Sequence, residues 1–147
     1  MNTKQLRFVS IGLLILLAGF YLYTDRQQHY YQSRALPAAR QMLLDITQWE
    51  KSALTKHLSE EALQTINDQQ LNKLLDHYRQ FGKFQSLGAL NFSRLTSALS
   101  LFGEKRINYA GSVQFDSGSA QLNMTLVELK VPNKPEQFKI YNLSIRR

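Results

Sequence analysis

The sequence contains no cysteine, and only three prolines and seven glycines in 147 residues. Without cysteine the chain has no disulfide, no thiolate metal ligand, no iron–sulfur cluster, no thiol nucleophile and no site for a lipoprotein anchor. The hydrophobic fraction of 44% excludes a chain that is disordered throughout. A chain of this length has room for one domain.

Runs of charge and the common catalytic motifs are missing too. The net charge is +7, yet no run of Lys and Arg is longer than two residues. Dispersed charge of this kind is typical of a solvated basic surface, so we expect no nucleic-acid partner. The sequence has no Gly-rich phosphate loop, no nucleophile elbow, no HExxH zinc motif and no EF-hand loop. These absences argue against the familiar enzyme classes.

One uncharged run stands out near the start of the chain. Phe8 to Tyr23 reads FVSIGLLILLAGFYLY, sixteen residues without a charge. As a helix this run is ~24 Å long at ~1.5 Å per residue. The hydrocarbon core of a bilayer is ~30 Å thick, but Tyr21 and Tyr23 suit the interface and Lys4 and Arg7 can extend to it. The run predicts a transmembrane helix.

A cleaved signal peptide is the closest alternative to this anchor. The residues that end the apolar run are bulky, so no pair of small residues marks a cleavage site. Phe20 follows Leu17-Ala18-Gly19, where a lipobox has its cysteine. We therefore expect residues 1–23 to form a cytoplasmic tail and an uncleaved signal anchor. The short basic start favours a single-pass protein of the bacterial inner membrane with its C-terminal domain in the periplasm.

Residues 24–35 form a polar and aromatic stretch that we interpret as a stalk. It is able to continue the anchor helix. Tyr30 and Tyr31 are adjacent in it and are candidates for a partner interface or for the lipid headgroup level. Pro37 suits the first turn of a new helix, because the missing N–H is unpaired there in any case. The soluble domain is therefore expected to span residues 36–147.

The first half of that domain has helical spacing. Apolar residues recur every three or four positions from Leu36 to Trp49, and the pattern continues to Leu58 after a break near Ser52. Ser59 has the chemistry of an N-cap for a short helix.

A further helix follows this short one. Asn67 or Asp68 caps it, and its apolar stripe runs from Leu71 to Phe81. Gly82 stands where a left-handed residue ends such a helix.

After Gly82 the apolar period changes to two, as in strands. Candidate strands cover 84–92, with a bend at Gly88, and then 107–115, 120–131 and 138–145, whereas 93–102 fits either a helix or a strand. The apolar parity flips near Leu126-Val127, which predicts a bulge or a twist that re-aims the strand, and it flips again at Tyr141-Asn142.

These elements predict an α+β fold. A transmembrane helix comes first, followed by two to three helices packed on a curved antiparallel sheet of three to four strands. A strongly curved sheet would wrap a helix into a cone.

The layout and three short segments suggest a family. Trp49 followed by Leu54 and Leu58, the segment Phe81-Gly82-Lys83-Phe84-Gln85-Ser86, and Phe138-Lys139-Ile140 followed by Leu143 and Ile145 carry the likeness. Over residues 36–147 the chain resembles the cystatin-like cone fold of the nuclear-transport-factor-two-like superfamily, although Phe138 stands where Trp is usual.

The resemblance implies several functions. Membrane-anchored periplasmic members commonly serve as assembly or scaffold subunits, others bind small ligands in the cone, and a minority are enzymes with a His–Asp pair inside it.

Few residues are candidates for chemistry. A ligand cavity in the cone would be lined by Trp49, Leu75, Tyr78 and Met124. The three histidines have surface explanations, although a cavity position stays open for His57. No His–Asp pair can be placed inside the cone, so we predict no catalytic residue, no metal site and no cofactor.

The sequence leaves two main hypotheses for the function, and an enzyme of the same fold ranks third. The first is a non-enzymatic accessory or assembly subunit of a membrane protein complex, whose partners are the bilayer, through residues 8–23, and the other subunits. The alternative is a periplasmic binding module that holds a lipid or a small apolar ligand in its cone.

Overall fold

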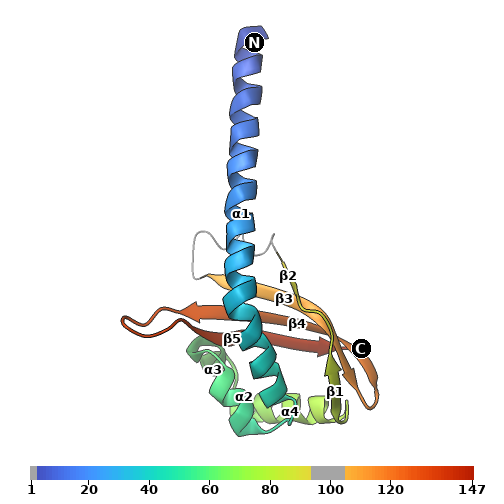
Figure 1. Ribbon diagram of the computed structural model, residues 1–147. Coiled ribbons are helices and arrows are strands. Elements are labelled where there is room, and N and C mark those ends of the chain that lie inside the picture. The colour runs from blue at the N-terminus through green and yellow to red at the C-terminus, as the bar shows by residue number, and fades with distance from the viewer. Residues whose placement is uncertain (1–2, 94–104) are drawn as a thin grey trace.

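The computed structural model describes residues 3–93 and 105–147, the first four of them by their backbone alone. Most of the expected segment 93–102 therefore lies outside the described residues. The elements in chain order are α1 (Thr3–Ile46), α2 (Lys51–His57), α3 (Glu60–Thr65), α4 (Asp68–Arg79), β1 (Phe84–Leu87), β2 (Asn91–Phe92), β3 (Arg106–Phe115), β4 (Gly118–Leu129) and β5 (Gln137–Arg146) (Figure 1).

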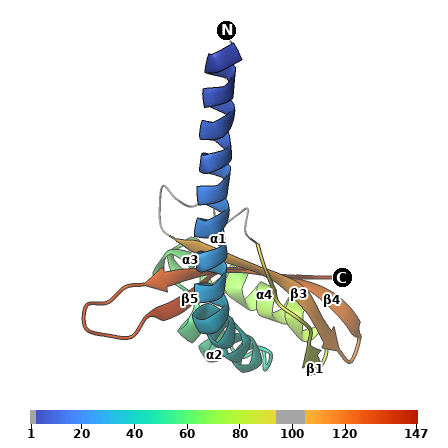
Figure 2. The same cartoon turned by 45° about the horizontal axis from the view of Figure 1, so that its top comes forward.

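The helix α1 dominates the shape of the molecule. It is a single helix of 44 residues, ~66 Å long at ~1.5 Å per residue. Its N-terminal half stands clear of the rest of the chain (Figures 1 and 2). The large apolar side chains between Phe8 and Tyr23 are 43–76% exposed there. This half is a candidate membrane-spanning helix, consistent with a single-pass anchor or a signal sequence.

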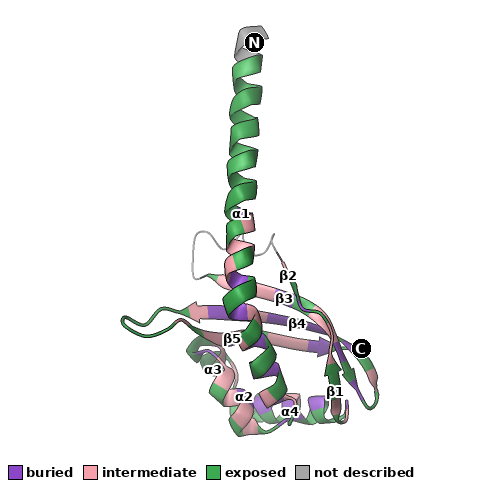
Figure 3. Ribbon diagram, in the orientation of Figure 1, coloured by how far each residue is buried: buried purple, intermediate pink, exposed green. Residues whose placement is uncertain are grey.

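The C-terminal half of α1 belongs to the core of the domain. Its buried residues recur at helical spacing along one face: Tyr31, Ala35, Ala39, Met42, Leu43 and Ile46. Figure 3 shows the change from an exposed to a partly buried helix along its length. Anchor, stalk and first domain helix are thus one continuous element.

The expectation that Pro37 starts a new helix is wrong, because Pro37 lies inside α1. A proline within a helix removes one backbone hydrogen bond and costs ~3 kcal/mol or more. The buried residues on either side of it, Ala35 and Ala39, pack into the core with no exposed surface. This packing holds the helix together across the proline.

The three later helices in the described residues are short, and the N-caps predicted for α3 and α4 are confirmed. The break after α1 falls at Thr47–Glu50, slightly before the expected position near Ser52, and Trp49 there has a left-handed φ of 56°. Ser59 accepts a hydrogen bond from the backbone N–H of Ala62, and Asn67 forms a capping box with Gln70.

Gly82 ends the segment after α4, with a φ of 81° as predicted. A Cβ at this position would also lie 3.2 Å from the Cβ of Asp116.

All strands pair antiparallel in one sheet with the order β1-β3-β4-β5, and β2 also pairs with β3. The predicted α+β class is confirmed. Within the described residues the sheet has five strands instead of the expected three to four, because the predicted strand 84–92 is interrupted at 88–90 and gives both β1 and β2.

The cone is not formed, because the sheet stays open and does not curl around a helix (Figures 1 and 2). The strands that would have to continue the wrap on one side are only four and two residues long.

The parity flip predicted at Tyr141-Asn142 is confirmed as a bulge on β5. The register between β4 and β5 shifts between Thr125 and Leu126, so that Tyr141 has no partner opposite it. On β4, Leu126 and Val127 are buried in succession, at 0% and 4% exposure, but Leu129 and Val131 are exposed and do not continue the predicted flip. An extra residue of this kind bends its strand locally.

The outer edge of β5 is closed by side chains and backbone from the helical layer. The backbone N–H of Ser59 donates to the carbonyl of Ile140 at 2.8 Å, and the Tyr78 hydroxyl donates to the carbonyl of Leu143 at 3.2 Å. Burial raises the pKa of Tyr78, so its phenol stays a donor at neutral pH. The two contacts satisfy carbonyls that an edge strand otherwise leaves open.

The hydroxyl of Tyr78 generates a stability prediction. Replacing it in Tyr78→Phe removes the donor of this part-buried hydrogen bond to Leu143, which costs about 0.5–1.5 kcal/mol of unfolding free energy. Urea unfolding of the full chain in mild detergent, followed by Trp49 fluorescence, measures this loss.

Tyr141→Phe is the matched control, since the Tyr141 hydroxyl makes no hydrogen bond to a described residue. If the two variants lose the same free energy, the edge contact contributes nothing specific.

Candidate functional site

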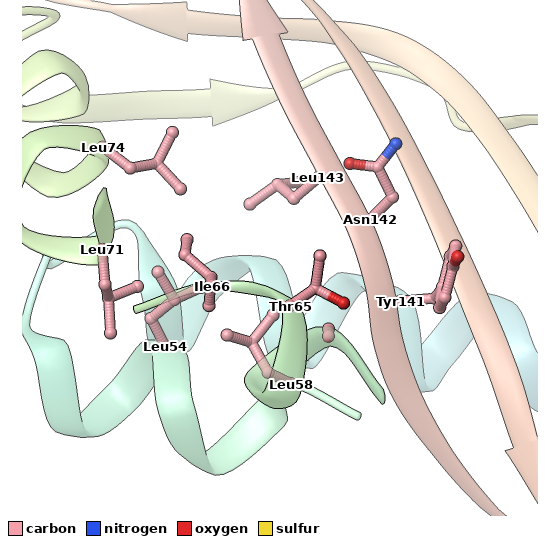
Figure 4. Close-up of a pocket in the computed structure, with 10 residues that line it drawn as sticks. Leu54, Leu58, Thr65, Ile66, Leu71, Leu74, Tyr141, Asn142 and Leu143 are labelled. Atoms are coloured by element: carbon pink, nitrogen blue, oxygen red, sulfur yellow. The ribbon is translucent and has the colours of Figure 1, made fainter. Parts of the chain in front are cut away.

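An apolar pocket of about 330 Å³ opens between the three short helices and β5 (Figure 4). Leu54 and Leu71 are buried in its wall, whereas the other lining residues are partly or fully exposed. The lining residues are Leu54, Leu58, Ala62, Thr65, Ile66, Leu71, Leu74, Tyr141, Asn142 and Leu143.

The pocket exists because β5 is held at two points on either side of its bulge. Ser59 fixes the strand at Ile140, and Tyr78 fixes it at Leu143, while the bulged residue Tyr141 lies between them. The helix that faces this stretch, α3, is six residues long and contributes no buried side chain. It is therefore too short to fill the space.

The chemistry of the pocket is that of an apolar receptor. None of its ten lining residues is charged. The Thr65 hydroxyl donates to the carbonyl of Glu61 at 2.8 Å, so its proton already forms a hydrogen bond within α3. A cation lies beside the lining: the guanidinium carbon of Arg106 is 3.9 Å from the centroid of the Tyr141 ring. An uncharged, largely aliphatic group fits this lining.

The four residues predicted to line a cavity lie in the core instead of this pocket. Trp49, Leu75, Tyr78 and Met124 are each 5% exposed or less. The structure brings Trp49 and Tyr78 together, with ring centroids 5.0 Å apart. Among the described residues, the indole N–H of Trp49 is buried without a hydrogen-bond partner. Ligand binding among these four residues stays a prediction.

Tyr30 and Tyr31, the predicted partner interface, are both engaged within the chain. The Tyr30 hydroxyl donates to Glu128 at 3.1 Å, and Tyr31 is 3% exposed. The Tyr109 hydroxyl donates to the carbonyl of Tyr31 at 3.1 Å, and the Tyr31 ring packs on Phe92. Burial, with the nearby charge of Glu128, raises the pKa of Tyr31 to about 12. Their role toward a partner stays a prediction.

A His–Asp pair that the sequence did not reveal joins α1 to α2. The Nε2 of His57 lies 2.9 Å from the Oδ2 of Asp45, with the two side chains 14% and 36% exposed. A smaller pocket of about 230 Å³ lies beside the pair, and Lys56 also lines it. The two residues are twelve positions apart, on either side of the α1–α2 break. The sequence therefore predicts their contact only if the position of that break is known.

The Asp45 carboxyl lies at the far end of α1 from the apolar segment 8–23. Its hydrogen bond with His57 is the main cause that lowers the pKa of Asp45, and Gln41 donates a second bond at 3.1 Å. In the described part of the chain, no three His, Asp or Glu side chains form a group able to hold a metal. The pair therefore has the chemistry of an interhelical contact.

Comparison with protein-family models, with curated proteins and with solved structures gives no significant match. No family is identified. The structure bears out the coarser description alone: a long N-terminal helix, further helices and an antiparallel sheet.

The lowered pKa of Asp45 leads to a pH-dependent prediction. A carboxylate whose pKa is lowered by folding stabilises the protein above its ordinary pKa of ~3.9, and this contribution disappears as the pH falls through the lowered value. Asp45→Asn should therefore lower the Tm at pH 7, and the difference from the wild type should shrink below about pH 4. Thermal unfolding in detergent from pH 7 to pH 3 measures both effects.

Asp25→Asn on the same helix is the matched control. Asp25 lies 3.7 Å from His29 in an exposed pair, so its replacement should leave the Tm nearly unchanged. A Tm difference for Asp45→Asn that persists unchanged at pH 3 would show that its carboxylate charge is not the cause.

Proposed function

We propose that the protein is a non-enzymatic single-pass membrane protein whose extracytoplasmic α+β domain acts as an accessory or assembly subunit of a membrane protein complex. One observation carries this proposal. The exposed apolar half of α1 continues without a break into the half that packs in the domain core. The domain is thereby held directly at the membrane surface.

The apolar half of α1 needs a non-aqueous environment. Burial of apolar surface is worth ~25 cal/mol per Å², so a row of exposed Leu, Ile and Phe side chains is strongly unfavourable in water. The segment from Phe8 to Tyr23 offers such a row on all sides of the helix. A bilayer covers all sides of a helix at once, which supports an anchor over a contact with one partner helix.

The stalk fixes the height of the domain above the bilayer. Tyr31, the first residue of α1 that is buried against the strands, follows Tyr23 by eight residues, or ~12 Å of helix. A partner in the same membrane would thus meet the domain at a defined height, as a scaffold or assembly role requires. We also propose that the membrane is the bacterial inner membrane and that the domain lies in the periplasm, because Lys4 and Arg7 precede the apolar segment.

The observed chemistry supports a non-enzymatic role. The His57–Asp45 pair lies at a helix junction and holds α1 against α2. Lys56 and Gln48 line the small pocket beside it, and no Ser or Thr is in its lining. The pair therefore has no hydroxyl beside it to activate as a nucleophile.

Native mass spectrometry after gentle detergent extraction from the source membranes tests the proposal. We expect the chain to migrate with larger subunits. A charge in the middle of the apolar segment, Leu16→Glu, should release it from both membrane and complex, because a charged residue at the bilayer centre costs ~3 kcal/mol.

Gln32→Glu adds the same charge to an exposed stalk position and should have no such effect. A lone wild-type monomer under these conditions would remove the support for the accessory role.

A second candidate function is a binding module for a small apolar ligand. The pocket at the β5 bulge favours it, although it lies outside the predicted cone. Its volume of about 330 Å³ accommodates roughly ten methyl-sized groups at ~30 Å³ each.

The same spectra test this second function. A bound small molecule should appear on the wild type and disappear in Ala62→Phe, which fills the pocket. It should remain in the control Ala89→Phe, at an exposed position. A ligand retained by Ala62→Phe would exclude this pocket as its site.

A further inference from the structure

The tip of the β4–β5 hairpin combines exposed apolar and basic side chains. Outside the segment 8–23, only four large apolar residues in the described parts of the chain are exposed, and two of them, Leu129 and Val131, lie here at 39% each. Lys130 and Lys134 are exposed beside them. Neither lysine forms an ion pair with a described residue.

A well-formed turn presents these side chains. The backbone N–H of Lys134 donates to the carbonyl of Val131 at 3.1 Å, which closes a four-residue turn. Pro132 occupies its second position, and Asn133 has a φ of 62° at its third. Proline followed by a left-handed Asn is typical of a type II turn. The tip thus has a defined shape.

The root of the hairpin is fastened to α1 on both of its strands. Glu128 of β4 accepts a hydrogen bond from Tyr30 at 3.1 Å, and Glu136, just before β5, pairs with Arg34 at 3.4 Å. Both carboxylates near the tip are therefore engaged by α1. The charge that the tip presents is the positive charge of its two lysines.

The length of α1 places this root close to the bilayer. Tyr30 follows Tyr23 by seven residues, or ~10 Å, and Arg34 follows it by eleven, or ~16 Å. The headgroup region adds ~5–7 Å to the hydrocarbon core on each side, and surface charge acts over a further ~8–10 Å in physiological salt. The hairpin projects sideways from α1, and the β3–β4 turn lies farther from the N-terminal end of the helix (Figure 1).

We propose that the hairpin tip, Leu129 to Pro135, contacts the anionic lipid surface of the leaflet from which α1 emerges. The inference rests on the proposed membrane anchor. In this contact Lys130 and Lys134 supply the positive charge for the lipid phosphates, and Leu129 and Val131 supply the apolar surface. Together with α1, the tip gives the domain a second point of contact with the bilayer and so fixes its rotation about the anchor.

Fluorescence quenching in nanodiscs tests this contact on the full chain. Because the sequence has no cysteine, Gln137→Cys places one fluorophore next to the tip, and Ser119→Cys places one near the β3–β4 turn as a control. The discs contain a lipid with a quencher in its headgroup, in phosphatidylcholine alone or with 30% phosphatidylglycerol. At position 137 we expect stronger quenching in the anionic discs than in the discs of phosphatidylcholine alone. At position 119 we expect the same quenching in both disc types.

The lysines supply the decisive variants. Each lysine near an anionic surface contributes roughly fivefold to its occupancy, so Lys130→Gln with Lys134→Gln should abolish most of the composition-dependent quenching. Lys73→Gln with Lys83→Gln removes the same charge from exposed positions on and after α4 and should preserve it.

Each outcome decides between the two proposals. Equal quenching at position 137 in both disc types, with the chain retained in the discs, overturns the hairpin contact and leaves the anchor intact. Quenching that survives the loss of both lysines also overturns it. A chain that is not retained in either disc overturns the anchor and the hairpin contact together.

Discussion

An α-helix satisfies its backbone hydrogen bonds within itself, so it can pass from lipid through water into a protein core without changing its structure. The rest of the molecule depends on this property of α1. Its side chains change along the axis, from the uncharged apolar run Phe8 to Tyr23, through polar residues, to a stripe that ends at Ile46 in the core. The apolar segment and the domain therefore share one continuous helix. With the proposed anchor in a bilayer, every surface of the domain has a defined height above it.

The other helices and the sheet pack around the C-terminal half of α1. One face of the sheet is covered by helices, and the edge of β5 is closed at Ile140 and Leu143. Between these two points the bulge at Tyr141 bends the strand, and the short helix α3 leaves a pocket there. At the other end of the β4–β5 hairpin, Tyr30 contacts Glu128 of β4, and Arg34 contacts Glu136 just before β5. The helical layer thus holds the β4–β5 pair at both of its ends.

Local chemistry predicted much of this fold. The caps at Ser59 and Asn67, the left-handed Gly82 and the bulge at Tyr141 all appear where periodicity and side-chain chemistry predict them. The errors arose where tertiary packing decides: the core on both sides of Pro37 outweighs its helix-breaking cost, and strand curvature did not close a cone. The β5 pocket and the His57–Asp45 contact join residues from different elements, so no local pattern marks them.

Hydrogen–deuterium exchange of the full chain in nanodiscs tests the central claim most directly, because it reports helical hydrogen bonding amide by amide. If α1 is one continuous helix, the amide hydrogens exchange slowly from the apolar segment through residues 24–46, except at Pro37, which has no amide hydrogen. A segment within residues 24–34 that exchanges as fast as an unfolded peptide would contradict it. The anchor and the domain would then be joined by a flexible linker, and the domain would have no defined height above the membrane.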